Sequence, residues 1–109
     1  MFRISMLATL MLPLVVGSVS AETSRIGDLR PGMSVDLTGS VTAIPDEDEF
    51  ILSDASGEVL VYIGPNAMPV QPSDKIRVIG VVDDDGPLEV YAREIVFSDG
   101  RRVEFTYSY

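Results

Sequence analysis

The sequence predicts an all-β domain that closes into a small Greek-key barrel of five strands, preceded by a short helical turn and followed by an extra strand. Three observations lead to this prediction. Five segments between residues 34 and 97 alternate apolar and polar side chains with the period of two that is typical of half-buried strands. Turn sequences rich in Asp, Gly and Pro separate most of them. A long connection, residues 64–72, separates the third strand from the fourth.

The first elements are a helical turn and a bent strand. Residues 24–30 form one predicted turn, with Ile26 and Leu29 on its apolar side, and Pro31-Gly32 ends it. The first strand is predicted at residues 34–44. Gly39 in the middle of this strand indicates a bulge or a sharp bend.

The remaining strands are short and regularly spaced. We predict them at residues 50–53, 58–63, 74–82 and 88–97, with a bulge near Arg93 and Glu94 where the alternation slips. The sequence Ser98-Asp99-Gly100-Arg101 predicts a hairpin turn into a sixth strand at residues 102–107. Short strands, a bent first strand and the long connection are the plan of a five-stranded barrel of the OB type. Closure would also remove exposed sheet edges.

The first 21 residues have the layout of a secretory signal peptide. Arg3 provides a positive start, an apolar stretch follows to Val16, and Val19 and Ala21 are small residues at the positions that a signal peptidase reads. The alternative is a retained membrane anchor, but a spanning helix needs about 20 apolar residues and this stretch is shorter. We therefore expect cleavage after Ala21, a periplasmic domain at residues 22–109, and no membrane span after cleavage.

Composition limits the chemistry that the domain can perform. The 109-residue chain carries a formal net charge of −9 and contains no His and no Cys. Their absence removes Ser-His-Asp triads, Cys nucleophiles and ordinary zinc sites. We expect no enzyme, no cofactor and no metal site, with a two-carboxylate hydrolase as the formal alternative. A negative surface with few aromatic residues and no Trp also argues against binding to nucleic acid.

Several sequence motifs resemble those of the bacterial OB-fold family of small periplasmic proteins. The resemblance lies in the order of five motifs: Ile26-x-Asp28-Leu29-x-Pro31-Gly32, Val35-x-Leu37-x-Gly39-x-Val41, Phe50-Ile51-Leu52-x-Asp54-x-x-Gly57, Val59-x-Val61-x-Ile63 and Pro72-x-Asp74-x-Ile76-x-Val78-x-Gly80-x-Val82. It implies an OB-type barrel that binds a small ligand, cationic or sugar-like, with roles in the envelope or in stress responses. It brings no catalytic residues. The chain departs from the family pattern by lacking a Trp after the third strand and by adding residues 101–109.

The candidate binding residues follow from where OB folds hold their ligands. The ligand lies across strands two and three, between the loop that joins strands one and two and the loop that joins strands four and five. These two loops carry the densest acidic clusters of the chain, and the strands between them offer an aromatic and a basic side chain. The predicted ligand-binding residues are Asp46, Glu47, Asp48, Tyr62, Arg77, Asp83, Asp84 and Asp85.

Each part of this site has a simpler alternative reading. Asp is common in turns because it suits their geometry, so both acidic loops could be solvated turns without a ligand. Leu60 and Ile79, which also point away from the predicted core, could pack under the loop at residues 64–72 instead of lining a groove. The spacing of ligands in an EF-hand is absent.

Two kinds of partner remain. The first is a small cationic or sugar-like envelope ligand at the acidic loops. The second is an envelope protein that pairs with an exposed strand, for which residues 102–107 are the candidate because Val103, Phe105 and Tyr107 alternate. The sequence does not specify the oligomeric state.

The position of signal cleavage is directly testable. We expect the mature chain to begin at Glu22, because Val19 and Ala21 satisfy the small-residue rule. The intact mass of the protein purified from a periplasmic fraction measures this. A mass that retains residues 1–21 would contradict the prediction.

Overall fold

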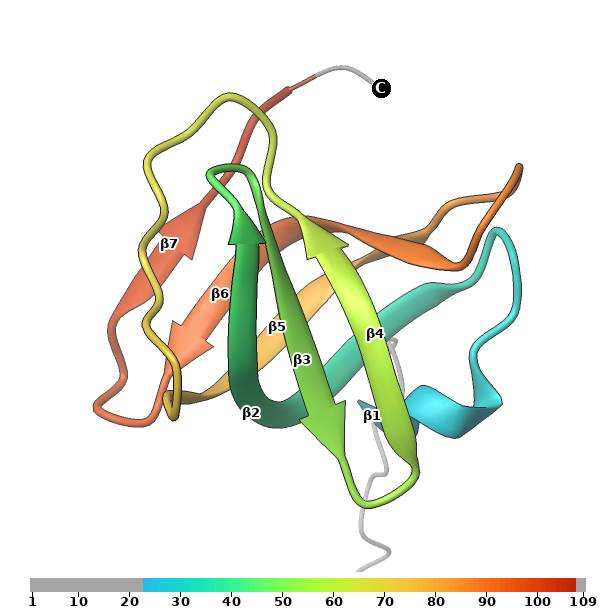
Figure 1. Cartoon of the computed structure of the whole chain (residues 1–109), viewed down its shortest axis with the longest axis horizontal. Coiled ribbons are helices and arrows are strands. Elements are labelled where there is room, and N and C mark those ends of the chain that lie inside the picture. The colour runs from blue at the N-terminus through green and yellow to red at the C-terminus, as the bar shows by residue number, and fades with distance from the viewer. Residues whose placement is uncertain (1–22, 108–109) are drawn as a thin grey trace, which may run out of the picture.

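The computed structural model describes residues 23–107, and these form one strongly curved sheet that closes on itself (Figure 1). Residues 1–22, and with them the predicted signal peptide and its cleavage site, lie outside the described residues. In chain order, the elements are β1 (Thr23–Ser24), the 3-10 turn η1 (Ile26–Asp28), β2 (Ser34–Asp46), β3 (Glu49–Asp54), β4 (Gly57–Tyr62), β5 (Lys75–Val82), β6 (Glu89–Phe97) and β7 (Arg102–Glu104).

The long strand β2 pairs with two different strands along its length. Residues 34–40 pair antiparallel with β5, and residues 40–46 pair antiparallel with β3. The change of partner occurs next to Gly39, where a Cβ atom would collide with the carbonyl oxygen of Ser53. The predicted bend at Gly39 is therefore confirmed, and glycine is required there by the close approach of β3.

Closure of the barrel depends on a parallel pairing between β4 and β6. Leu60, Val61 and Tyr62 lie opposite Glu89, Val90 and Tyr91. The rest of β6 pairs with β5, and the register there shifts so that Ile79 faces Glu94 while Gly80 faces Ala92. Arg93 is thus the extra residue of a bulge, at the place where the sequence predicts one.

The added strand β7 continues the sheet where β4 leaves it. It pairs antiparallel with residues 94–96 of β6, and the amide of Phe105 donates to the carbonyl oxygen of Arg93 at 2.9 Å. The first half of β6 therefore has β4 as its neighbour on this side and the second half has β7. The extra C-terminal strand is confirmed, although its regular pairing ends at Glu104, earlier than the predicted residue 107.

The interior is a single apolar core built from the inward residue of every second strand position. Phe50, Leu52, Val61 and Val78 are fully buried, as the alternation predicts. The complete set of buried hydrophobic residues is Ile26, Val35, Leu37, Val41, Phe50, Leu52, Val59, Val61, Ile63, Val70, Ile76, Val78, Val82, Val90, Ala92, Ile95, Phe97 and Phe105. Within the described part of the chain, no helix is long and apolar enough to cross a membrane.

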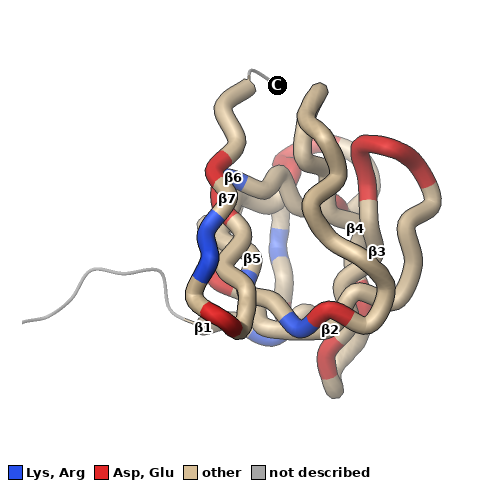
Figure 2. Tube along the Cα trace, turned by 90° about the vertical axis from the view of Figure 1, so that its left-hand side faces the viewer, with Lys and Arg blue, Asp and Glu red and all other residues tan. Residues whose placement is uncertain are grey.

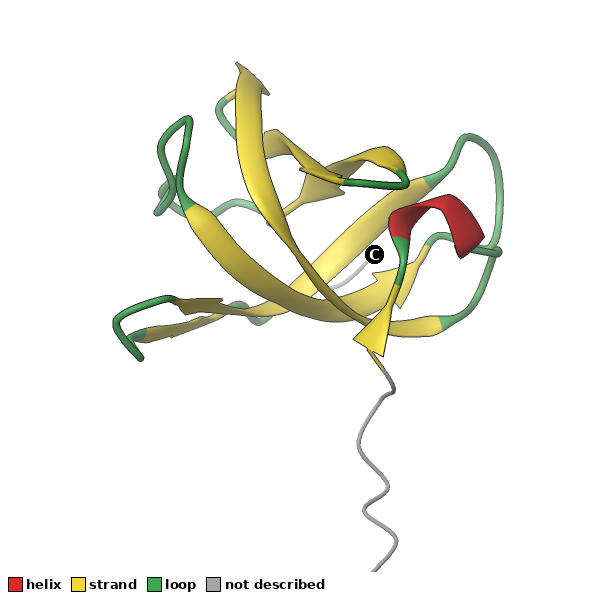
Figure 3. Ribbon diagram, turned by 90° about the horizontal axis from the view of Figure 1, so that it is seen from below, coloured by secondary structure: helices red, strands yellow, loops and turns green. Residues whose placement is uncertain are grey.

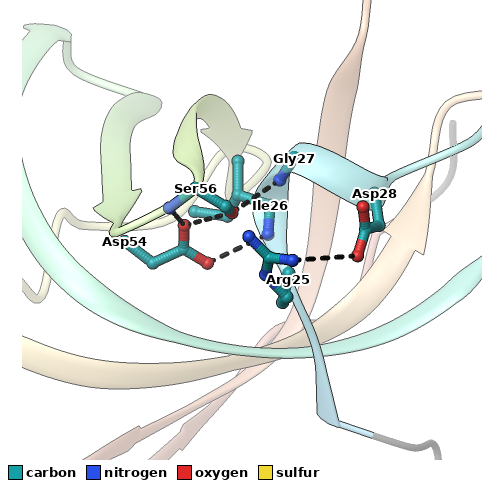
Figure 4. A network of polar contacts seen from close by, with 6 residues as sticks. All are labelled: Arg25, Ile26, Gly27, Asp28, Asp54 and Ser56. Carbon is teal, nitrogen blue, oxygen red and sulfur yellow. Dashed lines mark hydrogen bonds and ion pairs between the residues drawn. The ribbon is translucent and has the colours of Figure 1, made fainter.

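The N-terminal segment closes the barrel with one helical turn, which lies at the rim of the strands (Figure 3). Ile26 is 3 % exposed and belongs to the core. The turn at Asp54 and Ser56 holds the segment: the Ile26 amide donates to Asp54 Oδ2 at 2.9 Å, and the Gly27 amide donates to Ser56 Oγ at 2.8 Å (Figure 4). Asp54 Oδ1 also accepts from the Ser56 amide at 2.6 Å.

Removing the Asp54 carboxylate should release this N-terminal segment. Asp54→Ala should lower the free energy of unfolding by about 1–3 kcal/mol, because it leaves the partly buried amides of Ile26 and Ser56 without their charged acceptor. Urea unfolding measures the change. Asp28→Ala is the matched control, since Asp28 makes only an exposed ion pair with Arg25 at 3.9 Å, worth about 0–1 kcal/mol. Equal effects of the two substitutions would contradict the role assigned to Asp54.

Candidate functional site

Two rows of side chains run across the outer face of β3, β4 and β6. The cross-strand register sets the rows: the first is Glu49, Tyr62 and Tyr91, and the second is Ile51, Leu60 and Glu89. All six side chains are partly exposed, and they alternate along their strands with buried core residues. This is the face on which OB barrels hold their ligands, between the first and the last of the loops that connect the barrel strands. We call Glu49, Tyr62, Glu89 and Tyr91 the acidic tyrosine face.

The two tyrosines form the centre of this face. The rings of Tyr62 and Tyr91 meet edge to face, with their centroids 5.9 Å apart and their planes at 77°. Tyr91 also hydrogen-bonds to the Asp83 carboxylate. Burial, this hydrogen bond and the nearby negative charges raise the pKa of Tyr91 above its ordinary value.

The two acidic loops meet at the carboxyl groups of Glu49 and Glu89. These residues flank β4 on opposite sides, yet their side chains reach each other across it and share a hydrogen bond. Desolvation by burial, this hydrogen bond and the charges of Glu49, Asp83 and Asp48 raise the pKa of Glu89 to about 7. The face therefore carries a bound proton at acidic pH and loses it near neutrality.

Each acidic loop also lines a pocket of its own. One cavity of 420 Å³ is lined by Gly32, Val81, Val82, Asp83, Asp84, Asp85 and Tyr91. A second cavity of 550 Å³ is lined by Glu47, Asp48, Tyr62, Gly64, Pro65, Asn66, Ala67 and Met68. Tyr91 lines the first pocket and Tyr62 lines the second, and their two rings are in contact.

Three carboxylates converge at the turn between β2 and β3. One ligand atom from each of Asp46, Asp48 and Glu49 lies within 4.8 Å of the others, and hard cations bind through such oxygens. The same turn also has ordinary turn hydrogen bonds, since the Glu47 amide donates to Asp46 Oδ1 at 2.7 Å. In the second loop the Asp85 amide donates to Asp83 Oδ1 at 3.1 Å. Both acidic loops thus have ordinary turn hydrogen bonds, and in the first loop the carboxylates also lie close together.

The predicted site residues divide into three groups. Tyr62 is part of the acidic tyrosine face, Asp83 hydrogen-bonds to it, Asp48 acts on it through its charge, and Asp46 adjoins it through the carboxylate cluster. The remaining loop residues, Glu47, Asp84 and Asp85, line the two pockets.

Arg77 belongs to neither arrangement. Its Nη2 donates to Asp36 Oδ2 at 2.7 Å and its Nε donates to Asp36 Oδ1 at 3.2 Å. It lies near the start of β5, whereas the Asp83 loop follows the end of that strand, so the two are separated by roughly 20 Å of extended chain. The structure therefore does not bring Arg77 together with the acidic loops.

Sequence reasoning missed Glu49, Glu89 and Tyr91. Glu49 directly follows Asp48 in the first acidic turn, but it is not among the predicted binding residues. Glu89 and Tyr91 lie on the outer face of β6, and only the parallel pairing of β6 with β4 brings them beside Leu60 and Tyr62. A closed barrel requires contact between its third and fifth strands, so that requirement was the available signal.

Charge is distributed unevenly around the barrel. The basic residues at the start of β7 lie on the side away from the acidic turn between β2 and β3 in the view of Figure 2. There, Arg102 Nη1 contacts Glu94 Oε2 at 2.6 Å, and Arg77 contacts Asp36. Paired charges therefore occupy this side, while carboxylates gather at the acidic tyrosine face.

Comparison with known proteins identifies similar sequences and folds. Residues 18–95 match the family described as bacterial OB fold (BOF) protein. Among solved structures, the hypothetical protein ygiW from E. coli is 26% identical, with a TM-score of 0.60 over 81% of this chain and 100% of its own. No curated protein matches the sequence significantly.

Two further solved structures share the fold at lower identity. The second OB-fold domain of replication protein A from Methanococcus maripaludis is 20% identical, with a TM-score of 0.59 over 73% of this chain and 98% of its own. The telomere capping protein Ten1 from Saccharomyces pombe is 21% identical, with a TM-score of 0.54 over 72% of this chain and 82% of its own. These likenesses confirm the OB-type barrel that the strand pattern predicts.

The raised pKa of Glu89 predicts how stability depends on pH. An acid that titrates at about 7 in the folded chain and near 4.5 in the unfolded chain destabilises the fold as pH rises between these values. Glu89→Gln should remove this loss, so the variant should match the wild type at pH 5 and exceed its free energy of unfolding at pH 8. We expect a gain of about 1 kcal/mol, since solvent screens this partly exposed group.

Urea unfolding at the two pH values measures the effect. Glu58→Gln is the matched control, because Glu58 is an exposed carboxylate on β4 outside the two rows. A gain that is the same at pH 5 and pH 8, or that Glu58→Gln reproduces, would contradict the titration assigned to Glu89.

Proposed function

We propose a specific binding function for this chain, which belongs to the bacterial OB fold (BOF) protein family. An OB barrel is a binding module, and the feature that distinguishes one module from another is the chemistry of its outer face. In this chain, we propose that the acidic tyrosine face binds a small cationic ligand in the periplasm.

The observation that carries this proposal is the meeting of acids from distant parts of the sequence. Glu49 and Glu89 hydrogen-bond across β4, and Asp48 and Asp83 add negative charge beside them. Carboxylates gathered at one place raise the local concentration of cations. A bound cation would displace the proton from Glu89. It would also offset the repulsion between the Glu89 carboxylate and the neighbouring carboxylates, which raises the pKa of Glu89.

The neighbours of these acids favour an organic cation. Tyr62 and Tyr91 offer aromatic rings, to which ammonium groups are attracted. Ile51 and Leu60 provide half-buried apolar surface in the adjacent row, against which a hydrocarbon chain can pack. A linear polyamine combines both properties.

A sugar-like ligand is the second candidate. Tyr62 and Tyr91 also suit the apolar face of a sugar ring, and the carboxylates of Glu49 and Glu89 can accept hydrogen bonds from its hydroxyl groups. Such a neutral ligand would bind without a strong dependence on salt, which separates the two candidates experimentally.

We propose binding without catalysis. The carboxyl pairs of glycosidases are about 5 Å apart or more, so that a sugar or a water fits between them. Glu49 and Glu89 are closer, since they share a hydrogen bond. We also propose that nucleic acid is not the ligand, because single-strand binders track the phosphate backbone with a basic groove and this face is acidic.

The proposed periplasmic location rests on the sequence. Arg3, the apolar stretch after it, and Val19 with Ala21 have the layout of a secretory signal. A role in the envelope, including its response to stress, is proposed with the location. A cationic ligand present in that compartment would reach the domain after export.

Pairing with an envelope protein through residues 102–107 is less favoured. β7 already pairs with β6, Phe105 is 4 % exposed in the core, and Tyr107 packs against Tyr62. Only the outer edge of the three-residue strand β7 would be available to a partner.

Titration with spermidine and with Ca²⁺ tests the proposal. Backbone amide shifts of the purified domain should move together in residues 46–49 and 83–89. Affinity should rise between pH 5.5 and pH 8 as Glu89 loses its proton, and it should fall with added salt, because exposed charges are screened over about 8 Å at physiological ionic strength. Replacing both Glu49 and Glu89 by Gln should weaken binding about three- to tenfold.

The controls separate this site from general attraction to an acidic protein. Asp99→Asn removes a carboxylate that pairs with Arg101 at the turn between β6 and β7, and it should leave the affinity unchanged. Shifts confined to one loop, or an equal loss in the Asp99 variant, would contradict a joint site. Saturable binding of a neutral cell-wall sugar that is insensitive to salt would favour the second candidate.

A further inference from the structure

The C-terminal residues 105–107 bring Tyr107 beside the acidic tyrosine face, where its ring meets that of Tyr62. They lie beyond residue 95, where the match to the family ends. β7 and the buried ring of Phe105 bring this segment alongside β6, and the chain then turns Tyr107 toward the end of β4. A segment outside the family pattern therefore reaches one of the residues in the proposed binding face.

Tyr107 contacts Tyr62 through both its ring and its hydroxyl group. The two rings meet edge to face, with centroids 5.5 Å apart and planes at 89°. The Tyr107 hydroxyl lies 2.8 Å from the carbonyl oxygen of Ala92 and 3.1 Å from that of Tyr62. These carbonyl groups belong to β6 and β4 at the end of their parallel pairing, so the hydroxyl holds the two strands together there.

The Tyr107 ring is itself held from two other sides. A Cβ atom on Gly64 would lie 2.6 Å from the ring, so the chain after β4 passes directly against it. The guanidinium of Arg93 lies 4.9 Å from the ring centroid, and its Nη1 donates to the Tyr107 carbonyl oxygen at 3.3 Å. Arg93 is the residue of the β6 bulge, which turns it toward the C-terminal segment.

We propose that Tyr107 is a positioning residue for the binding face. It fixes the Tyr62 ring. It thereby also fixes the contact of Tyr62 with Tyr91 and the space that the Glu49 side chain crosses to reach Glu89. This inference rests on the proposed function of the face. The proposal also assigns a role to the added C-terminal segment, which sets the geometry of this site and does not contact the ligand.

These contacts make a continuous path from Tyr107 to both acidic loops. Tyr107 touches Tyr62, Tyr62 touches Tyr91, and Tyr91 hydrogen-bonds to Asp83 in the second loop. In the other direction, Tyr62 lies opposite Glu49 at the start of β3. Tyr62 is therefore the middle residue of its row. If the Tyr62 ring were held on one side only, its neighbours Glu49 and Tyr91 would be less constrained.

The alternative is that Tyr107 only fastens the C-terminus to the barrel. In that case its loss would lower stability, as would any weakening of β7, but the binding face would keep its geometry. Arg102 of β7 offers the matched control, because its exposed guanidinium pairs with Glu94 of β6 and, among the described residues, not with the tyrosines. Arg102→Gln should loosen the same segment without touching Tyr62.

The experiment compares Tyr107→Ala, Tyr107→Phe and Arg102→Gln with the wild type. Spermidine affinity at pH 8 should fall roughly three- to tenfold in Tyr107→Ala, the loss expected for an aromatic contact that orders the site. Tyr107→Phe keeps the ring and should retain most of the affinity, while losing the hydroxyl contacts with Tyr62 and Ala92. Arg102→Gln should bind as the wild type does. All variants are measured below their unfolding midpoints.

A second readout needs no ligand. Nuclear Overhauser contacts between the Tyr62 and Tyr91 rings, and the pH at which the Glu89 carboxyl titrates, report the geometry of the face directly. In Tyr107→Ala the ring contacts should weaken and the Glu89 titration should move down from about 7, because the pair with Glu49 is held less closely.

The outcomes distinguish the two proposals. Unchanged affinity, ring contacts and Glu89 titration in Tyr107→Ala would overturn the positioning role, as would equal changes in Arg102→Gln. If the wild type binds neither probe but Tyr107→Ala still shifts the Glu89 titration and the ring contacts, the proposed ligand class fails and the positioning role is supported.

Discussion

The structure depends on the closure of one sheet, and closure depends on the bend of β2. This strand pairs with β5 up to Ser40 and with β3 from Ser40 onward, so a single strand joins both halves of the barrel. A side chain at Gly39 would meet the carbonyl oxygen of Ser53, and one at Gly80 would meet that of Tyr91. Two glycines therefore allow β2 to approach β3 and β5 to approach β6 closely. Without the parallel pairing of β4 with β6, the core would be open and the outer rows would not form.

Closure also decides where the charges lie. The chain carries a net charge of −9, and acids at the β2–β3 turn and after β5 are distant in sequence. The pairing of β4 with both β3 and β6 places Glu49 and Glu89 on either side of one strand, and their side chains meet over it. Repulsion and desolvation at this point lower the stability of the ionised form. A local cost of this kind is typical of sites that serve binding rather than folding.

On β2, β5, β6 and β7, by contrast, acidic side chains are paired with basic ones. Asp36 pairs with Arg77 across β2 and β5, and Glu94 pairs with Arg102 across β6 and β7. In these pairs each charge has its partner, and the side chains cover the outer surface of the sheet. The C-terminal segment extends this paired surface and then reaches the acidic tyrosine face through Tyr107. One added segment thus connects a stabilised side of the barrel with the candidate site.

The sequence by itself determined the strands, the bend at Gly39, the bulge at Arg93 and the inward face of each strand, because the two-residue alternation of Val, Ile and Leu is a local property of the chain. It also indicated the two acidic loops, since the barrel type assigns those loops to the ligand face. Tertiary structure alone decided the partners. Alternation assigns Asp36 to the solvent side, yet Arg77 covers it and leaves it 7 % exposed. The two residues form an ion pair although they are 41 positions apart in the sequence. Glu89 joined the site for the same reason: the register of β6 against β4 depends on the closure of the whole barrel, and no local pattern encodes that register.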